Sequence, residues 1–344
     1  MKREESTVSY PLSDNDGKKV FFRDSELQPS FPFFSRKIKM RGLLPAWLFM
    51  LMDVVLLASC LLTFALFHHV MPRKMGFKGV QTYGEPGDWS EKWAEYFTSD
   101  GSIEITDTTY KSGDVYVNMS TVKKENLTYY IADIYVASIY SFRTAFANDT
   151  YGRGYTQTTL TQARNNKAAI AINGDFYGFR EQGIVVRNGV VYRTEIWEDA
   201  CVLYYNGKME TYSKDEFDMQ QAIDGGAWQA WSFGPSFLDK DGKAITSYES
   251  TIDGYHPRTA IGYFEPGHYC FVTIDGRQTG HSLGMSFADM ALMFEEMGCT
   301  AAYNLDGGKT SIMVFNNKIY NRPYEGGRKV SDIVFIGEPV FPEV

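Results

Sequence analysis

The chain has 344 residues, of which 44% are hydrophobic, so it can bury one large core or two ordinary ones. Its 42 acidic residues outnumber its 34 basic residues, which gives a formal net charge of −8 at pH 7. This balance argues against nucleic-acid binding driven by bulk electrostatics, because proteins that bind the phosphate backbone usually carry a basic surplus or stripe. Any basic residues that meet a phosphate must therefore form a small local group.

The first 42 residues and the run that follows them differ sharply in composition. Residues 1–42 carry scattered charge and no clear hydrophobic period, so we expect a disordered cytoplasmic tail. Residues 43–70 form an apolar run whose one acidic residue is Asp53, long enough to cross a hydrocarbon core of about 30 Å. We therefore predict a transmembrane helix. A cleaved signal peptide is the alternative, but about forty residues precede the run and no small-x-small cleavage signature follows it.

Basic residues flank this run on both sides. Four precede it and three follow it: Arg36, Lys37, Lys39 and Arg41, then Arg73, Lys74 and Lys78. Because basic residues are more frequent on the cytoplasmic side of a span, the sequence favours a cytoplasmic N-terminus. We expect a single-pass cell-membrane protein, anchored through residues 43–70, with an extracellular C-terminal domain. Residues 71–124 are predicted to be a juxtamembrane linker with leading strands.

The four cysteines indicate no disulfide framework. Cys60 lies inside the apolar run, which leaves Cys201, Cys270 and Cys299, an odd number without a close C-x-x-C pair. We expect these three to be buried free thiols. No His or Cys residues show the spacing of a known metal-ligand set, so we expect neither a metal nor another cofactor.

From about residue 100 the sequence alternates short apolar strands with tight turns. The pairs Asn188-Gly189, Asn206-Gly207 and Asp241-Gly242 each separate two strand-like runs. Such pairs tolerate the positive φ that two-residue hairpin turns require. This part of the chain is therefore predicted to be rich in β-strands.

Two helices are predicted to interrupt the strands, at residues 156–165 and 286–297. In the second helix Ser286 can cap the first turn, Asp289 stands three residues later, and Gly298 follows the end. The spacing of its apolar residues places them on one stripe that faces a core. We expect an α+β fold, in which a mixed β-sheet packs against two principal helices.

Each predicted helix is followed by a small apolar strand that ends in Asn or Asp beside Gly. The two segments are "AAIAINGDF" (168–176) and "AAYNLDGG" (301–308). If these strands were adjacent in a sheet, Asn173, Asp175, Asn304 and Asp306 would meet at one edge, where glycines let a ligand approach the backbone. The alternative is an Asx-type turn between two strands.

Two further strands also carry polar groups at their ends. "YHPRTAIGY" (255–263) places Arg258 and Thr259 at the head of a strand, and "CFVTIDGRQTGHSLGMSF" (270–287) ends a strand in Asp275-Gly276-Arg277. Four strand ends with amide, carboxylate and guanidinium groups indicate a binding or catalytic cleft rather than isolated turns.

Together these segments resemble the phosphodiester glycosidase domain family. The resemblance covers about residues 125–338 and includes "YYIADIYVAS", "TAFANDTYG", "AINGDFYG", "GIVVRNG", "SFGPSFLDKDG", "HPRTAIGY", "NLDGGKTSIMV" and "GGRKVSDIVFI" in that order. It implies a domain at 125–340 whose cleft holds Asn173, Gly174, Arg258, Thr259, Asp275, Gly276, Arg277, Asn304, Asp306, Gly307 and Gly308. Two residues depart from the family pattern, since Asp175 and Lys309 stand where glycine is common. These two departures leave the identity of the substrate open.

The reaction that the resemblance implies breaks the bond between an anomeric carbon and a phosphodiester oxygen. A phosphate monoester leaves more readily than a sugar alkoxide, so proton donation by a carboxylic acid is less necessary than in ordinary glycosidases. Arg258 and Arg277 are the candidates that bind the phosphate, because a guanidinium forks onto phosphate oxygens. Asp306 is the candidate carboxylate at the anomeric centre, as nucleophile, base or electrostatic partner. Asp275 either shares that task or orients Arg277 or a loop amide.

Six further residues each have two possible roles, and the protein itself has alternative functions. His256 and His281 are either general acids or structural histidines. Phe176, Tyr177, Trp228 and Trp231 either stack on a sugar ring or pack in the core. The expected partner is a sugar phosphodiester or phosphorylated glycan of the cell envelope or an exopolysaccharide. The rivals to a hydrolase are a non-catalytic glycan-binding protein and an exopolysaccharide assembly factor, which both leave the glycine-flanked acids unexplained.

Overall fold

The computed structural model describes residues 45–77 and 79–341, and the predicted tail at 1–42 lies outside this range. The chain divides between Thr63 and Phe64 into two units, which are described separately. The first unit contains most of helix α1 (Ala46–Ala65), which continues as a π-helical turn at Leu66–Val70. Over Ala46–His68, 23 residues, this is the one helix in the described part that is long and apolar enough to cross a membrane. An N-terminal apolar helix is therefore confirmed, and by length and composition it fits a signal anchor or a signal peptide.

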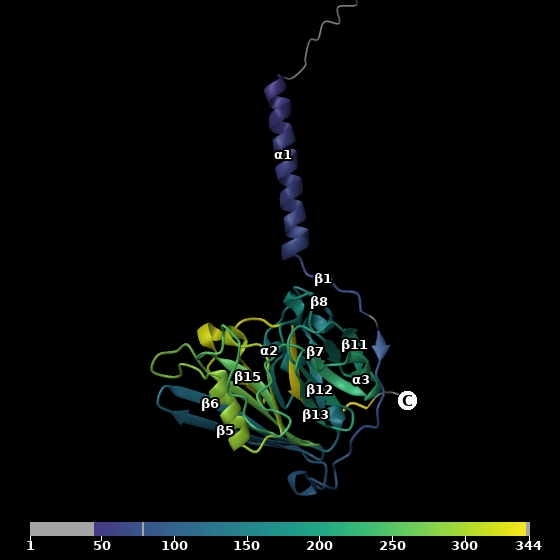
Figure 1. Cartoon of the computed structure of the whole chain (residues 1–344), viewed down its shortest axis with the longest axis vertical. Coiled ribbons are helices and arrows are strands. Elements are labelled where there is room, and N and C mark those ends of the chain that lie inside the picture. The colour runs from purple at the N-terminus through teal and green to yellow at the C-terminus, as the bar shows by residue number, and fades with distance from the viewer. Residues whose placement is uncertain (1–44, 78, 342–344) are drawn as a thin grey trace, which may run out of the picture. The chain divides into compact units, whose positions relative to one another are not determined.

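The second unit contains three larger antiparallel sheets and a two-stranded ribbon (Figure 1). The ribbon pairs β1 (Arg73–Lys74) with β8 (Gly152–Arg153). The seven-stranded sheet has, in spatial order, the strands β17 (Ala301–Asn304), β15 (Arg258–Glu265), β16 (His268–Ile274), β6 (Leu127–Val136), β5 (Val115–Lys124), β4 (Thr109–Lys111) and β3 (Glu104–Ile105). Strands before residue 125 therefore pair into the same sheet as the strands that carry Arg258 and Asn304.

The other two sheets supply the opposite walls of the core. The six-stranded sheet has the order β13 (Met209–Tyr212), β12 (Ala200–Tyr204), β14 (Ala227–Trp231), β10 (Val185–Arg187), β11 (Val190–Arg193) and β2 (Val80–Gln81). The five-stranded sheet has the order β19 (Lys318–Ile319), β18 (Met313–Phe315), β9 (Ile170–Asn173), β20 (Asp332–Ile336) and β7 (Phe142–Phe146). The central strands β12, β14, β9 and β20 are buried along their whole length, as expected of strands covered on both faces.

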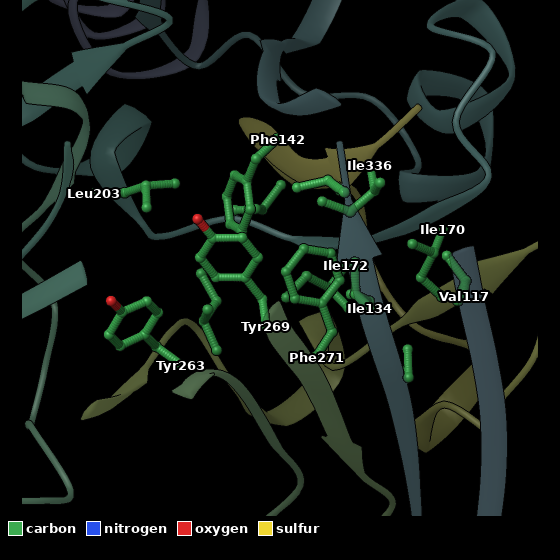
Figure 2. Packing of buried hydrophobic residues seen from close by; sticks show 14 of the residues in the cluster. Val117, Ile134, Phe142, Ile170, Ile172, Leu203, Tyr263, Tyr269, Phe271 and Ile336 are labelled. Atoms are coloured by element: carbon green, nitrogen blue, oxygen red, sulfur yellow. The ribbon is translucent and has the colours of Figure 1, made fainter. Parts of the chain in front are cut away.

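The core lies where the faces of these sheets meet (Figure 2). Ile134 and Phe271 from the seven-stranded sheet pack with Phe142 and Ile172 from the five-stranded sheet, and Leu203 joins from the six-stranded sheet. Burial of each such side chain contributes about 1.5–3 kcal/mol relative to exposure. The ends of strands from different sheets are thereby fixed against one another.

Each of the three larger sheets also carries one helix on its outer face. Helix α2 (Thr159–Asn165) packs on the five-stranded sheet, α3 (Met219–Asp224) on the six-stranded sheet and α4 (Phe287–Glu296) on the seven-stranded sheet. Ser286 accepts a hydrogen bond from the Asp289 backbone N–H at 3.1 Å, as the capping pattern predicts. The α+β fold and the two predicted helices are confirmed, and the short α3 is an addition.

Two smaller predictions are also confirmed. Asn188 and Gly189 have φ values of 51° and 77° in the turn between β10 and β11. Cys201, Cys270 and Cys299 are buried free thiols. The predicted domain boundaries at 71–124 and 125–340 stay predictions.

Candidate active site

Asn173 at the end of β9 connects the ends of two different sheets. Its Nδ2 donates to the Asp306 carbonyl at 2.7 Å, while its Oδ1 accepts from Thr259 Oγ1 at 2.8 Å. β9 belongs to the five-stranded sheet, and β17, which leads to Asp306, belongs to the seven-stranded sheet. The two strands are therefore not neighbours in one sheet, yet their ends meet. Asn173 and Thr259 are fully buried, so they hold this junction rather than line a cavity.

The two glycines after Asp306 allow the loop to pass close to another backbone segment. A Cβ at Gly307 would lie 2.8 Å from the Pro257 carbonyl oxygen, a contact that is too short for a side chain. Gly308 has φ +70°, in the left-handed region, and its N–H donates to the same carbonyl at 3.0 Å. The Asp-Gly-Gly sequence thus presents the Asp306 carboxylate beside the start of β15.

A pocket of about 340 Å³ opens at this junction. Six of the predicted site residues line it: Arg258, Arg277, Asn304, Asp306, Gly307 and Gly308. Its walls also contain His256, Lys309 and Arg328. Among the described lining residues Asp306 is the one carboxylate, set against three arginines and a lysine. In a chain of net charge −8, this pocket is a local concentration of positive charge.

Asp306 combines burial with a small exposed opening to the pocket. Its side chain is 14% exposed, its Oδ1 accepts the Gly307 N–H at 3.0 Å, and its Oδ2 lies 3.2 Å from Arg328 Nη2. Burial raises the pKa of Asp306 above its ordinary value, and Arg328 opposes this shift. A carboxylate with a raised pKa is a better base or nucleophile than an exposed one.

Arg258 is held rigidly at the edge of the pocket. Its Nε donates to the Met285 carbonyl at 3.2 Å, and its Nη2 donates to the Ile252 and Gly254 carbonyls at 2.5 and 2.6 Å. The guanidinium also lies over the Phe287 ring, 3.9 Å from its centroid. Burial lowers the pKa of Arg258 to about 10, so the group remains charged at neutral pH. These contacts orient the Arg258 guanidinium. Within the described residues, no carboxylate forms an ion pair with it.

Arg277 is an exposed cation of the pocket, as are Lys309 and Arg328. It has φ 58°, and its Nη2 lies 3.3 Å from His256 Nδ1. Burial and the two neighbouring arginines hold the pKa of His256 below its ordinary value, so its ring is neutral. Lys309 pairs with Glu325, whereas Arg277 forms no ion pair with a described residue. Arg277 therefore has donors available to an anionic ligand.

Asp275, although close in sequence to Arg277, does not line the pocket. It is buried, and its carboxylate accepts hydrogen bonds from Tyr130, His281, Asn321 and the Arg322 backbone at 2.7–3.2 Å. His281 therefore contacts Asp275 and does not line the pocket. Gly276, between Asp275 and Arg277, is packed against Pro257, where a Cβ would lie 2.6 Å from the proline nitrogen.

A buried charge cluster lies against Gly174, whose carbonyl accepts the Asp306 N–H at 3.4 Å. Arg187 Nη2 lies 3.0 Å from Asp332 Oδ2 and 3.3 Å from Asp175 Oδ1. Burial raises the pKa of Asp332 to about 7, although Arg187 acts in the opposite direction. A Cβ at Gly174 would lie 2.2 Å from Asp332 Oδ1, so glycine is required there. The sequence interpretation singled out Gly174 and Asp175 but missed Arg187, Asp332 and Arg328, although "GIVVRNG" and "GGRKVSDIVFI" contain them.

The aromatic candidates separate into core and site residues. Tyr177, Trp228 and Trp231 are buried and belong to core clusters. Phe176 is half-buried and lies below Arg328, whose guanidinium carbon is 5.6 Å from the ring centroid. Within residues 45–77 and 79–341, no three His, Cys, Asp or Glu side chains are grouped so that they could hold a metal ion.

Comparison with known proteins identifies the family. The phosphodiester glycosidase family model matches residues 166–337, half of the chain. The chain belongs to the phosphodiester glycosidase family. The matched region includes the strands and loops that carry every predicted site residue, from Asn173 to Gly308.

A bacterial protein is similar to this chain in sequence, and the catalytic domain of an animal enzyme is similar to it in fold. The SPbeta prophage-derived uncharacterized protein YomE of Bacillus subtilis is 32% identical over 202 residues, which cover 55% of this chain and 31% of the relative. The chain thus corresponds to about a third of that protein's length. The catalytic domain of zebrafish N-acetylglucosamine-1-phosphodiester alpha-N-acetylglucosaminidase superposes with a TM-score of 0.54 at 16% identity, covering 77% of this chain and 97% of the other. This second likeness shows a shared fold.

Proposed function

We propose that this protein hydrolyses sugar-1-phosphodiesters between the anomeric carbon and the phosphodiester oxygen. The observation that carries the proposal is the pocket itself, in which one carboxylate of raised pKa faces three arginines and a lysine. Membership in the phosphodiester glycosidase family supports the same reaction class. A phosphodiester carries one negative charge, and the pocket supplies the opposite charge on rigid and exposed arginines.

In the proposed reaction the arginines act on the leaving group and Asp306 acts on the sugar. Arg277 is proposed to bind the phosphate oxygens through paired N–H donors, because a guanidinium donates two N–H bonds in a fixed geometry. Arg258, whose Nε and Nη2 already donate to backbone carbonyls, is proposed to contact the phosphate through Nη1. As the bond from the anomeric carbon to oxygen breaks, its electron pair moves to the phosphate, and these cations stabilise the growing charge. Water supplies the new oxygen on carbon, and one of its two protons passes to the released phosphomonoester or to solvent. The products are a free sugar and a phosphomonoester.

Asp306 faces the positive charge that develops at the anomeric carbon. It must be ionised to do so, and Arg328 at 3.2 Å favours the ionised form against the effect of burial. Asp275 is proposed to position Arg277 through the rigid segment Asp275-Gly276-Arg277. Asn173, Thr259 and the glycines are proposed to hold the loop, and Asn304 to contact the substrate from the pocket wall.

We also propose that the protein is a single-pass membrane protein whose catalytic domain lies outside the cell. The apolar helix Ala46–His68 supports this location by its length and composition. The basic residues before residue 43 support a cytoplasmic N-terminus. An envelope or exopolysaccharide glycan that contains phosphodiesters would then be within reach of the domain.

The test uses the full chain in detergent micelles with sugar-1-phosphodiesters, including UDP-N-acetylglucosamine. Free sugar and the matching phosphomonoester are assayed together for the wild type, Asp306→Asn and Arg258→Ala. Asp133→Asn is the matched control, because Asp133 also contacts one basic side chain, His268 at 2.8 Å, but lies outside the pocket. We expect both products from the wild type and the control, and a loss of about 10²–10⁴-fold in Asp306→Asn.

Three other results would count against the proposal. Release of sugar 1-phosphate would place the cut on the other side of phosphorus. Binding of a glycan without any product would favour a glycan-binding protein. Full activity of a folded Asp306→Asn variant would remove the carboxylate from the reaction.

A further inference from the structure

Two of the buried cysteines lie against the same glycine. Gly262 in β15 is opposite Cys270 on the neighbouring strand β16 and opposite Ala302 on the other neighbour, β17. A Cβ built at Gly262 would lie 2.6 Å from Cys270 Sγ and 3.0 Å from Cys299 Sγ. The two sulfur atoms therefore fill the space that the missing side chain of residue 262 leaves open.

Cys299 reaches this position from the end of helix α4. Its N–H donates to the Phe294 carbonyl at 3.0 Å, and the N–H of the next residue, Thr300, donates to the Tyr263 carbonyl at 2.8 Å. The chain thus turns from the helix back to β15. Cys270 and Cys299 both belong to the apolar cluster on which α4 packs. Their proximity is a product of the tertiary fold, so the spacing of the cysteines in the sequence does not show it.

The two thiols interact with each other directly. The hydrogen bond between them, together with burial, raises the pKa of the Cys270 thiol. Cys270 is fully buried, and Cys299 is 3% exposed. Because the two sulfurs are already neighbours in the reduced protein, an S–S bond of about 2.05 Å forms by their approach to each other and joins no separate parts of the fold.

Cys201 provides a contrast within the same domain. It is also fully buried, but it lies on β12 of the six-stranded sheet, opposite Trp231. It belongs to the central core cluster and not to the cluster on which α4 packs. Burial raises the pKa of its thiol. Of the three cysteines in this unit, two are therefore paired and the third is a natural control.

We propose that Cys270 and Cys299 are a redox pair, which a small-molecule disulfide oxidises to one internal disulfide bond. Cys299, the more exposed thiol, attacks the oxidant to form a mixed disulfide, and Cys270 then attacks the Cys299 sulfur. One S–S bond forms in the protein and one breaks in the oxidant. The oxidant accepts two electrons and two protons and leaves as two thiols. The proposed location outside the cell places the domain in an environment where such bonds persist.

The bond would close a loop that includes part of the catalytic pocket. The chain between the two cysteines carries Arg277 and helix α4, so the end of the helix would be fastened to β16. A cross-link of this kind stabilises a protein mainly by restricting the unfolded chain. Since both sulfurs are buried in the folded domain, we expect rapid oxidation during folding and slow oxidation of the native protein.

The test treats the wild-type full chain in detergent micelles with reduced or oxidised glutathione, in enough urea to open the core. The urea is removed, free thiols are blocked with N-ethylmaleimide under denaturing conditions, and the peptides are mapped by mass spectrometry. With oxidised glutathione we expect the Cys270 and Cys299 peptides to be joined and lighter than their sum by two hydrogen atoms. Cys201 should carry N-ethylmaleimide or glutathione instead. With reduced glutathione all three should carry N-ethylmaleimide.

Thermal unfolding supplies a second measurement. The oxidised form should have a Tm at least about 5 °C above that of the reduced form. Cys299→Ala should remove this difference, whereas Cys201→Ala, the same change at another buried cysteine, should retain it. If Cys299→Ala does not fold, the peptide map of the wild type decides the question alone.

Three outcomes would overturn the proposal. The first is recovery of Cys270 and Cys299 on separate peptides at every ratio of oxidised to reduced glutathione. The second is a bond from Cys201 to either of them as frequent as the bond between them. The third is a Tm that is equal in the two forms, or that rises equally in a folded Cys299→Ala variant. None of these measurements requires hydrolysis of a substrate, so they are independent of the proposed function.

Discussion

Replacing Gly174 with alanine would place a methyl group against the buried carboxylate of Asp332. An ideal Cβ at residue 174 lies 2.2 Å from Asp332 Oδ1 and 2.5 Å from its Cγ, distances that real Cβ atoms essentially never show. The carboxylate must turn away, so the contacts from Arg187 Nε and Nη2 to Asp332 Oδ2, both 3.0 Å, are lost. Because Gly174 accepts the Asp306 N–H at 3.4 Å, the catalytic loop is disturbed as well.

The free energy of unfolding should fall by about 2 kcal/mol. Breaking a buried ion pair costs about 3–5 kcal/mol, and we take the lower end because Asp175 remains 3.3 Å from Arg187. The loss of backbone freedom in the unfolded chain returns about 0.4–1 kcal/mol, since φ at Gly174 is one that alanine accepts. The remainder, about 2 kcal/mol, is large compared with ordinary surface substitutions.

Urea denaturation of the full chain in detergent, followed by tryptophan fluorescence, measures this loss. Gly76→Ala is the control, because a Cβ there meets nothing within 4 Å, and it should change stability by less than about 0.5 kcal/mol. The same alanine is then introduced into an Asp332→Ala background, which lacks the Cγ, Oδ1 and Oδ2 atoms that the new Cβ would meet. If Gly174→Ala is equally destabilising in both backgrounds, or harmless in the first, the proposed link between Gly174 and the buried charges is wrong.

Three more substitutions separate the roles of the pocket residues. Arg277→Ala should lower kcat/KM about 10–100-fold, the loss of a hydrogen bond to a charged group, while urea denaturation shows unchanged stability; a normal kcat/KM would exclude it from phosphate binding. Arg328→Gln removes the cation that opposes burial, so the pKa of Asp306 rises further and the acid limb of the kcat/KM profile moves to higher pH; a shift to lower pH contradicts this sign. His281→Asn should keep kcat within about threefold and lower Tm through its lost bond to Asp275, whereas a loss of at least 10²-fold in kcat with Tm unchanged would make it a general acid.

Local patterns in the sequence predicted much of the fold. The turn at Asn188-Gly189 needs only two residues of positive φ, and helix α4 is specified by its cap at Ser286 and its apolar stripe. Each of these features is decided within about ten residues of chain. The same holds for the loop after Asn304, where Asp306 and two glycines stand together. Arg258 and Arg277 could be predicted as site residues because they occupy strand ends. A charged side chain at the end of a core strand usually has a binding or structural role.

Features that depend on distant pairing were not predicted. Arg187 and Asp332 are 145 residues apart, and each alone reads as an ordinary charged residue at a strand end. The placement of β9 and β17 in separate sheets also requires the full topology, since both strands show the same small apolar pattern. The sequence left open whether Asp275 shares the task of Asp306 or orients a neighbouring group. The four groups that surround the Asp275 carboxylate come from three distant segments, so local sequence could not show them.

An acidic chain can still bind a phosphodiester because electrostatic screening makes the local charges decisive. At physiological ionic strength the Debye length is about 8 Å, so a bound phosphate responds mainly to the cations of its own pocket. The wider surface, with its net charge of −8, still disfavours ligands that carry several negative charges. A substrate with one scissile phosphodiester and otherwise neutral sugars satisfies both conditions.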